Sequence, residues 1–225
     1  MSDETPQNAS NRSSAANADE LELHEAAAPE VDDAKSAPVD REAAGPYDAS
    51  EVPAMRPYVD LGGIKVAPRE GLQLRLEVDE RAQRVVAVSL EYAESLLQVQ
   101  AFSAPKTTGL WNEVRTEIAQ QLGSQGAEVS HEDGELGPEL LVRSAGTNEQ
   151  EVRLARFVGV DGPRWLLRGV IMGRAAAEAD AKARVIELFR ELVVVRGDEP
   201  MPPSELLELK VPAGLAQGET GVQQA

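Results

Sequence analysis

The sequence predicts an α+β fold, an antiparallel sheet of six or seven strands flanked by two main amphipathic helices. Several segments alternate apolar and polar residues with a period of two, which is typical of half-buried strands, and two longer segments repeat apolar residues with the helical period. The ends of the chain differ because they are polar and poor in large apolar residues. We therefore expect a disordered acidic tail over residues 1–54, a single domain over 55–212 and a disordered tail over 213–225.

The acidic character of the chain is concentrated in its first 50 residues. They hold 12 Asp and Glu against three Lys and Arg, a net of −9 within the −17 of the whole chain. Low hydrophobicity with self-repelling charge cannot offset the entropy lost when a chain is ordered, which is why disorder is expected there. The sign of the charge also argues against non-specific nucleic-acid binding, since Lys and Arg supply that affinity by neutralising phosphates.

Three consecutive antiparallel strands are predicted by the alternating segments that follow the tail. The stretch "LQLRLEVD" (72–79) alternates Leu and Val with polar side chains, and "VVAVSLEY" and "LLQVQAFSA" continue the pattern around a turn near Ala93. Two further short strands are expected in "AEVSHEDGELGPELLVRSA", around Gly134 and Gly137, and a last strand over Leu206–Val211.

Two helices are predicted where the apolar period changes. The first has Thr108 as its expected N-cap and ends at Gly123. The second begins near Ala175 with residues that favour helix formation. The apolar stripes consist of Trp111, Val114, Ile118 and Leu122 in the first helix and of Ala181, Val185, Leu188, Phe189 and Leu192 in the second.

The stretch "FVGVDGPRWLLRGVIMG" (157–173) raises a choice between a glycine-rich ligand loop and a β-hairpin. A phosphate-binding loop leads into a helix N-terminus, whereas Gly159 and Gly162 lead into the apolar run that begins at Trp165. A hairpin is therefore favoured.

The turn residues predict the loop and the register of this hairpin. Pro163 has no N–H to close a two-residue turn, so a four-residue loop from Asp161 to Arg164 is expected. Pairing the residues on either side of that loop places Gly169 opposite Arg156. The missing side chain would leave room there for the arginine stem.

Residue types and segments that are missing from the sequence exclude several classes of function. The chain has no Cys and only two His, His24 and His131, so thiol chemistry is excluded and a His-based metal site lacks ligands. The acids around His131 are interpreted as a solvated loop. We expect no metal, no cofactor and no catalytic residue. The sequence therefore favours a protein that is not an enzyme. No secretory signal and no run of about 18 apolar residues is visible, so we expect a cytoplasmic protein without membrane contact.

Arginines gather in the hairpin region of this acidic chain. Between Arg143 and Arg174 six arginines stand against three acids, a local net of +3. Such segregation of charge can bind an anion or dock an acidic segment. The candidate anion- or partner-binding residues are Arg153, Arg156, Arg164, Arg168 and Arg174.

Two functions from different classes are compatible with these features. The leading hypothesis is a non-enzymatic interaction or adaptor module that binds an unidentified protein through a sheet face or edge, with the acidic tail as a competitor for the arginine-bearing face. The alternative is binding of a small anion or a nucleotide-related ligand at the hairpin, residues 153–174. Trp111 and Trp165 are assigned to the core, since each lies on the apolar stripe of its own element.

Several motifs together resemble one protein family. The segments "DLGGIKVAP", "QVQAFSAPKTTGLWNEVRTEIAQQL", "LGPELLV", "FVGVDGPRWLLRGVIMG" and "VVVRGDEPMPPSELLELKVP" are similar, in this order, to motifs of the actinobacterial domain of unknown function 3710 family. The resemblance covers roughly residues 47–212 and implies an actinobacterial, cytoplasmic protein, without a reaction or catalytic residues to carry over. The order of elements also resembles the Mog1/PsbP-like α+β fold, and a fold does not determine a function.

Overall fold

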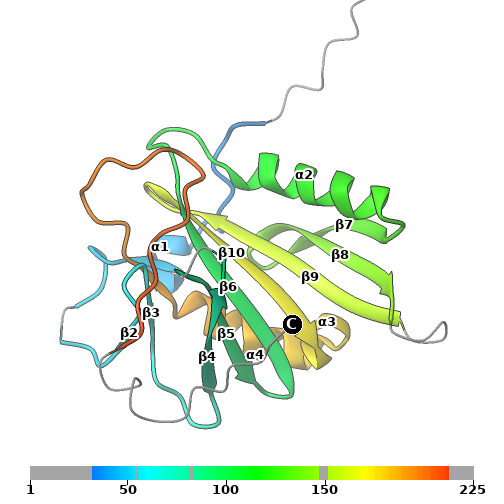
Figure 1. The fold of residues 1–225 in the computed structure, drawn as a ribbon, viewed down its shortest axis with the longest axis horizontal. Helices are drawn as coiled ribbons and strands as arrows, with labels where there is room; N and C mark the ends of the chain where they lie inside the picture. The colour runs from blue at the N-terminus through cyan, green and yellow to red at the C-terminus, as the bar shows by residue number, and fades with distance from the viewer. Residues whose placement is uncertain (1–31, 54, 82–83, 147–151, 213–225) are drawn as a thin grey trace, which may run out of the picture. The chain divides into compact units, whose positions relative to one another are not determined.

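The computed structural model describes residues 32–53, 55–81, 84–146 and 152–212, which all belong to one compact unit of the chain (Figure 1). Its fold is α+β, as the sequence predicts. The helices are α1 (Arg41–Ala44), α2 (Trp111–Ser124), α3 (Arg174–Ala177) and α4 (Ala179–Arg190). The strands are β1 (Tyr47–Asp48), β2 (Val59–Asp60), β3 (Ile64–Val66), β4 (Gln73–Asp79), β5 (Arg84–Tyr92), β6 (Ser95–Ser103), β7 (Glu128–Gly134), β8 (Gly137–Ala145), β9 (Val152–Asp161), β10 (Trp165–Gly173) and β11 (Val193–Val194).

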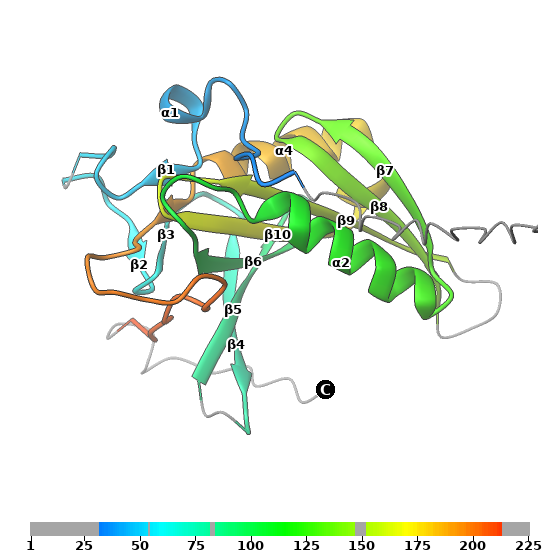
Figure 2. The ribbon, with the colours of Figure 1, turned by 90° about the horizontal axis from the view of Figure 1, so that it is seen from above.

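A seven-stranded antiparallel sheet forms the centre of the fold. Its order is β4-β5-β6-β10-β9-β8-β7, so β4 and β7 are its edges. The helix α2 packs across β7, β8 and β9 on one face, and α3 and α4 pack on the other (Figure 1 and Figure 2). The three consecutive strands, the pair β7-β8 and the hairpin β9-β10 that alternation predicts are all present.

Two apolar clusters hold the helices on the sheet. Alternation along β10 sends Leu167 and Ile171 into the larger cluster with Phe189 of α4, and sends Leu166 into the smaller cluster with α2. The smaller cluster consists of Ala104, Leu110, Trp111 and Leu166. Trp111 and Trp165 are both 0% exposed, which confirms that each belongs to the core.

A second sheet of very short strands, with the order β1-β11-β3-β2, is not predicted by the sequence. Tyr47 of β1 pairs in parallel with Val193 of β11, and Arg41 just before it is only 7% exposed. The expected disorder therefore does not hold for residues 32–53, because they pack against the end of the chain's last helix and strand. The remainder of the expected tails, residues 1–31 and 213–225, lies outside the described residues.

The register of the β9-β10 hairpin differs by two residues from the prediction. Three residues connect the strands, and the turn is closed by the Gly162 N–H, which donates to the Trp165 carbonyl over 2.8 Å. Arg156 consequently lies opposite Ile171, and Gly169 lies opposite Val158. The missing side chain at Gly169 makes room for Phe189 of α4 and not for the stem of Arg156. A Cβ at Gly169 would lie 2.9 Å from Cε2 of Phe189.

Helix α2 begins later than predicted and is capped by a distant residue. Thr108 is not its N-cap; Leu110 holds that position and makes no side-chain cap. The Asp161 carboxylate instead accepts the N–H groups of Leu110 at 2.9 Å and Trp111 at 3.3 Å. Spacing along the chain could not reveal a cap that comes from another strand.

The last predicted strand, Leu206–Val211, is reduced to isolated bridges. Leu206 bridges to Phe102, and Leu209 bridges to Gly62 and Val85. The backbone of this segment forms hydrogen bonds with the end of β6, beyond the part of β6 that pairs with β5. This extended backbone explains why its leucines have a strand-like pattern. Among the described residues, no helix is both long and apolar enough to cross a membrane.

Candidate functional site

The five candidate arginines do not form one common surface. Arg156 and Arg168 lie on adjacent strands but on opposite faces of the sheet, because Arg156 pairs with core residue Ile171 whereas Arg168 is two residues from Leu166, under α2. Arg164 lies in the hairpin loop and Arg174 follows the far end of β10. Arg153 is an exposed residue of β9.

Arg156 is part of a buried ionic cluster on the α3 and α4 face. Its Nη1 lies 2.6 Å from Oε1 of Glu139 and 2.5 Å from Glu132, and its Nε donates to the Ala176 carbonyl. Lys182 Nζ also lies 2.5 Å from Oε1 of Glu139, whose side chain is 2% exposed. Burial works against the charge of Arg156, but the two carboxylates raise its pKa overall. Arg156 therefore serves to join α3 and α4 to the sheet.

Two more candidates are also paired with acids of the chain. Arg164 lies 3.3 Å from Asp198 and is 44% exposed. Arg174 pairs with Glu94 and lies 2.7 Å from Glu178, the extended residue between α3 and α4. Exposed pairs of this kind contribute about 0–1 kcal/mol each, and they leave these guanidinium groups already neutralised.

Arg168 has a different environment. It lies between Gln100 of β6 and Gly159 of β9, its Nη2 donates to Gln100 Oε1, and its Cζ lies 5.4 Å from the centroid of the Phe102 ring. Burial lowers the pKa of Arg168, and within the described part of the chain no ion pair opposes that effect. Its buried Nε has no hydrogen-bond partner there.

Trp111 fills the space over Gly159, the residue that pairs with Arg168 on the neighbouring strand. A Cβ at Gly159, which pairs with Arg168, would lie 2.3 Å from the Trp111 indole, so only glycine allows this close approach. The indole N–H donates to the Pro138 carbonyl over 2.7 Å and so fixes the ring. An indole ring fixed by this hydrogen bond thus lies over the strand position that pairs with Arg168.

The apolar side chains around Arg168 are incompletely buried. Phe102, Val114, Ile118 and Phe157 pack on the smaller core cluster but remain partly exposed. Figure 2 shows that α2 lies along β8 and β9 and does not extend to β4 and β5. We call the surface formed by Phe102, Val114, Ile118, Phe157 and Arg168 the open face.

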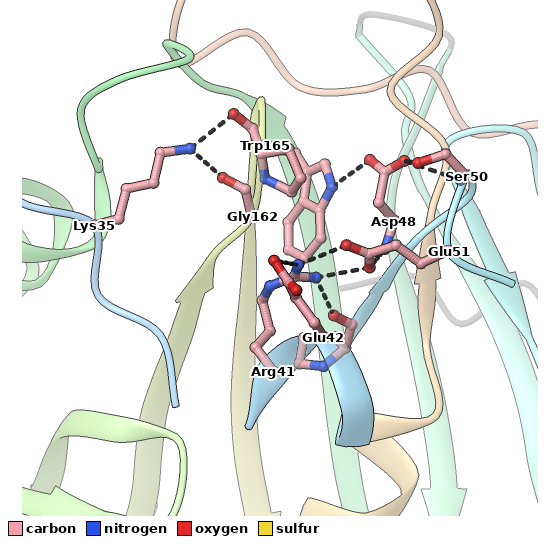
Figure 3. A network of polar contacts seen from close by, with 10 residues as sticks. Lys35, Arg41, Glu42, Asp48, Ser50, Glu51, Gly162 and Trp165 are labelled. Carbon is pink, nitrogen blue, oxygen red and sulfur yellow. Dashed lines mark hydrogen bonds and ion pairs between the residues drawn. The ribbon is translucent and has the colours of Figure 1, made fainter. Parts of the chain in front are cut away.

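A second polar network, which the sequence did not predict, ties residues 32–51 to the β9-β10 turn (Figure 3). We call this segment the strap. Arg41 binds both carboxylate oxygens of Glu51, at 2.6 and 2.8 Å, with its Cζ 5.9 Å from the centroid of the Trp165 ring. The Trp165 indole donates to Asp48 over 2.9 Å, and Lys35 donates to the carbonyls of Gly162 and Pro163.

The charges of the strap stabilise one another. Hydrogen bonding to Glu51 raises the pKa of Arg41 despite burial. Burial alone would raise the pKa of Glu51, but its hydrogen bonds with Arg41 and the Asp48 amide lower the pKa below its usual value. Burial likewise opposes the charge of Asp48, whose pKa is lowered by hydrogen bonds from Ser50 and Trp165.

Asp161 joins the strap to α2. Its carboxylate, in a residue only 2% exposed, accepts the N–H of Ser36 over 2.9 Å in addition to the two amides at the start of the helix. Burial raises the pKa of Asp161, although these hydrogen bonds and the nearby Lys35 act in the opposite direction. Three segments far apart in the sequence meet at this carboxylate.

One signal could have led to the strap. Tyr47 is the first aromatic residue of the chain, and it follows Pro46 within a segment otherwise dominated by small and acidic residues. Its hydroxyl donates to the Ala43 carbonyl over 3.1 Å. The pairing of Arg41 with Glu51 leaves no such trace, because the two residues belong to no common helix or strand whose period would show in the sequence.

The residues around His131 do not form the solvated loop that the sequence predicts. His131 belongs to β7, and its Nδ1 lies 3.1 Å from Nη1 of Arg115 on α2. In the part of the chain that the structure describes, no group of three or more His, Asp and Glu residues could hold a metal ion.

Comparison with known proteins gives one positive result. The family model described as "Protein of unknown function (DUF3710)" matches residues 45–218. No curated protein and no solved structure matches the chain. The resemblance to the Mog1/PsbP-like fold and the actinobacterial origin stay predictions.

Proposed function

Since the chain belongs to the DUF3710 family, whose description assigns no activity, we propose from the geometry that it is an interaction module, which binds a segment of another protein on the open face. The proposal keeps the leading hypothesis from the sequence and places the binding site on one surface. That surface is mainly apolar and contains one of the five candidate arginines, Arg168.

The main support for the proposal is that the apolar stripe of α2 is only partly buried. Trp111 is 0% exposed, whereas Val114 and Ile118, on the same side of the helix, remain partly exposed next to Phe102 and Phe157. Apolar area removed from water contributes about 25 cal/mol per Å². A partner that covers these side chains would gain this free energy, and the rigid sheet beneath them needs little reordering.

The charge of the chain limits the kind of partner. At a net charge of −17, the chain repels acidic proteins at long range and attracts basic ones. We therefore expect a partner segment that is apolar where it meets the open face and basic outside it, in a protein of the same compartment, which the sequence indicates is the cytoplasm.

A peptide selection tests the proposal. Peptides from a random displayed library are selected on the immobilised full chain, and their footprint is mapped by amide hydrogen exchange. We expect protection in β6, in β10 and along α2. Ile118→Asp should weaken binding at least ten-fold, because it puts a charge into the apolar contact.

The matched control is Gln121→Asp, which adds the same charge on the exposed side of α2 and should change affinity less than two-fold. Thermal unfolding of both variants establishes that they remain folded. Failure to select any peptide, or protection confined to other elements, would contradict the proposed function.

The alternative function, binding of a small anion or nucleotide, is favoured by one observation: the guanidinium of Arg168 forms no ion pair with the described residues. Thermal shift with inorganic phosphate and with ATP as probes tests this alternative, because a ligand that binds the folded state raises Tm. A phosphate-induced rise that disappears in Arg168→Met, without any selected peptide, would favour it.

The acidic N-terminal segment is proposed as a modulator. Residues 1–31 carry seven acids against one arginine and could compete with a partner for Arg168. Peptide affinity is compared between the full chain and a chain that begins at residue 32. Equal affinity at low and at high salt would remove this part of the proposal.

A further inference from the structure

We infer that the partner segment carries a carboxylate that pairs with Arg168 in the centre of the open face. This inference rests on the proposed function and specifies the chemistry of the ligand. It starts from the state of one side chain: a half-buried guanidinium whose charge is disfavoured by its surroundings and opposed by no acid of the described residues.

The guanidinium is held in place before any ligand binds. Gln100 accepts a hydrogen bond from Nη2 of Arg168, and Gln100 is itself fixed because its Nε2 donates to the Val86 carbonyl over 3.0 Å. The Phe102 ring flanks the guanidinium at 5.4 Å. A guanidinium fixed by a neutral amide and an aromatic ring keeps its full charge and loses little side-chain entropy when an anion arrives.

Two acids on the same face of the sheet as Arg168, Glu77 and Glu91, are already bound elsewhere. Glu77 accepts hydrogen bonds from Ser89 and, over 2.5 Å, from Gln98. Glu91 lies 3.1 Å from Arg75 at the edge strand β4. Rearranging either carboxylate toward Arg168 would break an existing contact, so neither of them supplies its counter-charge, and we assign that role to the ligand.

A carboxylate fits this position better than a phosphate group. The guanidinium has five N–H donors, of which one hydrogen bond is formed with the described residues, so a bidentate carboxylate can be accommodated. A carboxylate brings one negative charge to one arginine. A phosphate brings up to about two, and the surplus would meet the negative field of the whole chain.

The apolar rim strengthens the pair. Phe102, Val114, Ile118 and Phe157 would be covered together with Arg168, and the exclusion of water strengthens the ion pair. The ligand is therefore an apolar protein segment with one Asp, Glu or terminal carboxylate at its centre.

A double-mutant cycle tests the inference with the selected peptides. The best peptide and its version with Asp→Asn or Glu→Gln, or with an amidated terminus, are titrated against the full chain, Arg168→Met and Arg168→Lys. Neutralising the acid should weaken binding of the unaltered chain at least ten-fold and that of Arg168→Met less than two-fold. Arg168→Lys should fall between them, since it keeps the charge and loses the bidentate geometry.

Arg174→Gln is the control, since Arg174 is an exposed arginine that already has two acidic partners, and affinity should change less than two-fold. Acetate and inorganic phosphate serve as competitor probes, and the inference requires that neither displaces the peptide at equal ionic strength. Two results would overturn the inference and leave the proposed function standing. One is a peptide that binds the open face without an acid. The other is an equal loss of affinity, when the peptide acid is neutralised, for the unaltered chain and for Arg168→Met. If no peptide is selected, both fail.

Discussion

Arg41 and Arg168 are two guanidinium groups in similar positions with opposite partners. Each lies beside an aromatic ring, Trp165 at 5.9 Å for Arg41 and Phe102 at 5.4 Å for Arg168. Arg41 is bound by both oxygens of Glu51, and its pKa is raised, whereas Arg168 has a neutral amide as its partner, and its pKa is lowered. The fold stabilises the charge of the first and only tolerates the charge of the second.

This difference is the one expected between a structural arginine, Arg41, and the binding arginine that we propose, Arg168. In the strap, removing either member of the pair leaves an uncompensated charge inside the protein, so the pair serves to hold residues 32–51 on the hairpin. On the open face, the uncompensated charge is present already. Its cost is offset when a ligand brings the counter-charge, which is the logic of a preorganised binding group.

The largest effect is expected for Arg41→Ala. It leaves Glu51 without its bidentate partner and removes the cation beside Trp165, so the free energy of unfolding should fall by about 3 kcal/mol. Urea unfolding monitored by tryptophan fluorescence measures the change. A loss below about 1 kcal/mol would mean that the strap pair is no stronger than a surface pair.

Acidification should weaken the strap and leave the Arg168 region unchanged. Glu51 and Asp48 have pKa values below their usual ones, so the stability they contribute is present above the unfolded values near 4 and is lost as pH falls through the folded values. Asp161 acts with the opposite sign, because its raised pKa means that protonation relieves the cost of burying its charge.

Unfolding measured between pH 6 and pH 3 in the unaltered chain and in Glu51→Gln separates these contributions. Glu51→Gln should be less stable at pH 6 and lose less stability toward pH 3. An Arg168→Met profile that departs in shape from that of the unaltered chain would show that Arg168 interacts with a titrating acid after all.

Arg168→Met should have a small effect on stability, opposite in sign to that of Arg41→Ala. Methionine keeps the contact with Phe102 and removes a desolvated charge, so the free energy of unfolding is expected to stay the same or to rise by about 1 kcal/mol. The same denaturant experiment measures it. A loss comparable to that of Arg41→Ala would contradict a binding role and place Arg168 with the structural arginines.

The smallest effect is expected for Arg174→Gln. Its two acidic partners are both more than half exposed, at 71% and 52% of their side chains, so the change in the free energy of unfolding should stay within about 0.5 kcal/mol. This variant gives the baseline against which the other arginines are compared. A larger loss would indicate that the turn at Glu94 depends on this pair.

Local sequence patterns anticipated much of the fold and little of the candidate site. The alternation along "LQLRLEVD" and the stripe beginning at Trp111 predict their elements because strand and helix periods are local properties of the backbone. The helical stripe also contained the apolar half of the open face, Val114 and Ile118. It was interpreted as core, since the sequence does not record how far α2 extends over the sheet.

Charge clustering in the sequence did not predict how the arginines are grouped in space. Arg156 and Arg168 are twelve residues apart and look alike in the sequence, but strand pleating and the hairpin register put them on opposite faces. Their partners come from β7, β8 and β6, at separations of 17 to 68 residues. The strap was missed for the same reason, since Asp161 accepts hydrogen bonds from residues 50 to 125 positions away.

The sequence by itself determined the fold class, the succession of the strands of the seven-stranded sheet along the chain and the burial of both tryptophans, because each of these follows from periodicity and from the hydrophobic effect. Only the tertiary structure decided that Arg156, Arg164 and Arg174 pair with acids and that Arg168 has no acidic partner among the described residues. Ion pairs depend on distances of a few ångströms between segments that are remote in the sequence, and these distances are set only when the sheet has assembled.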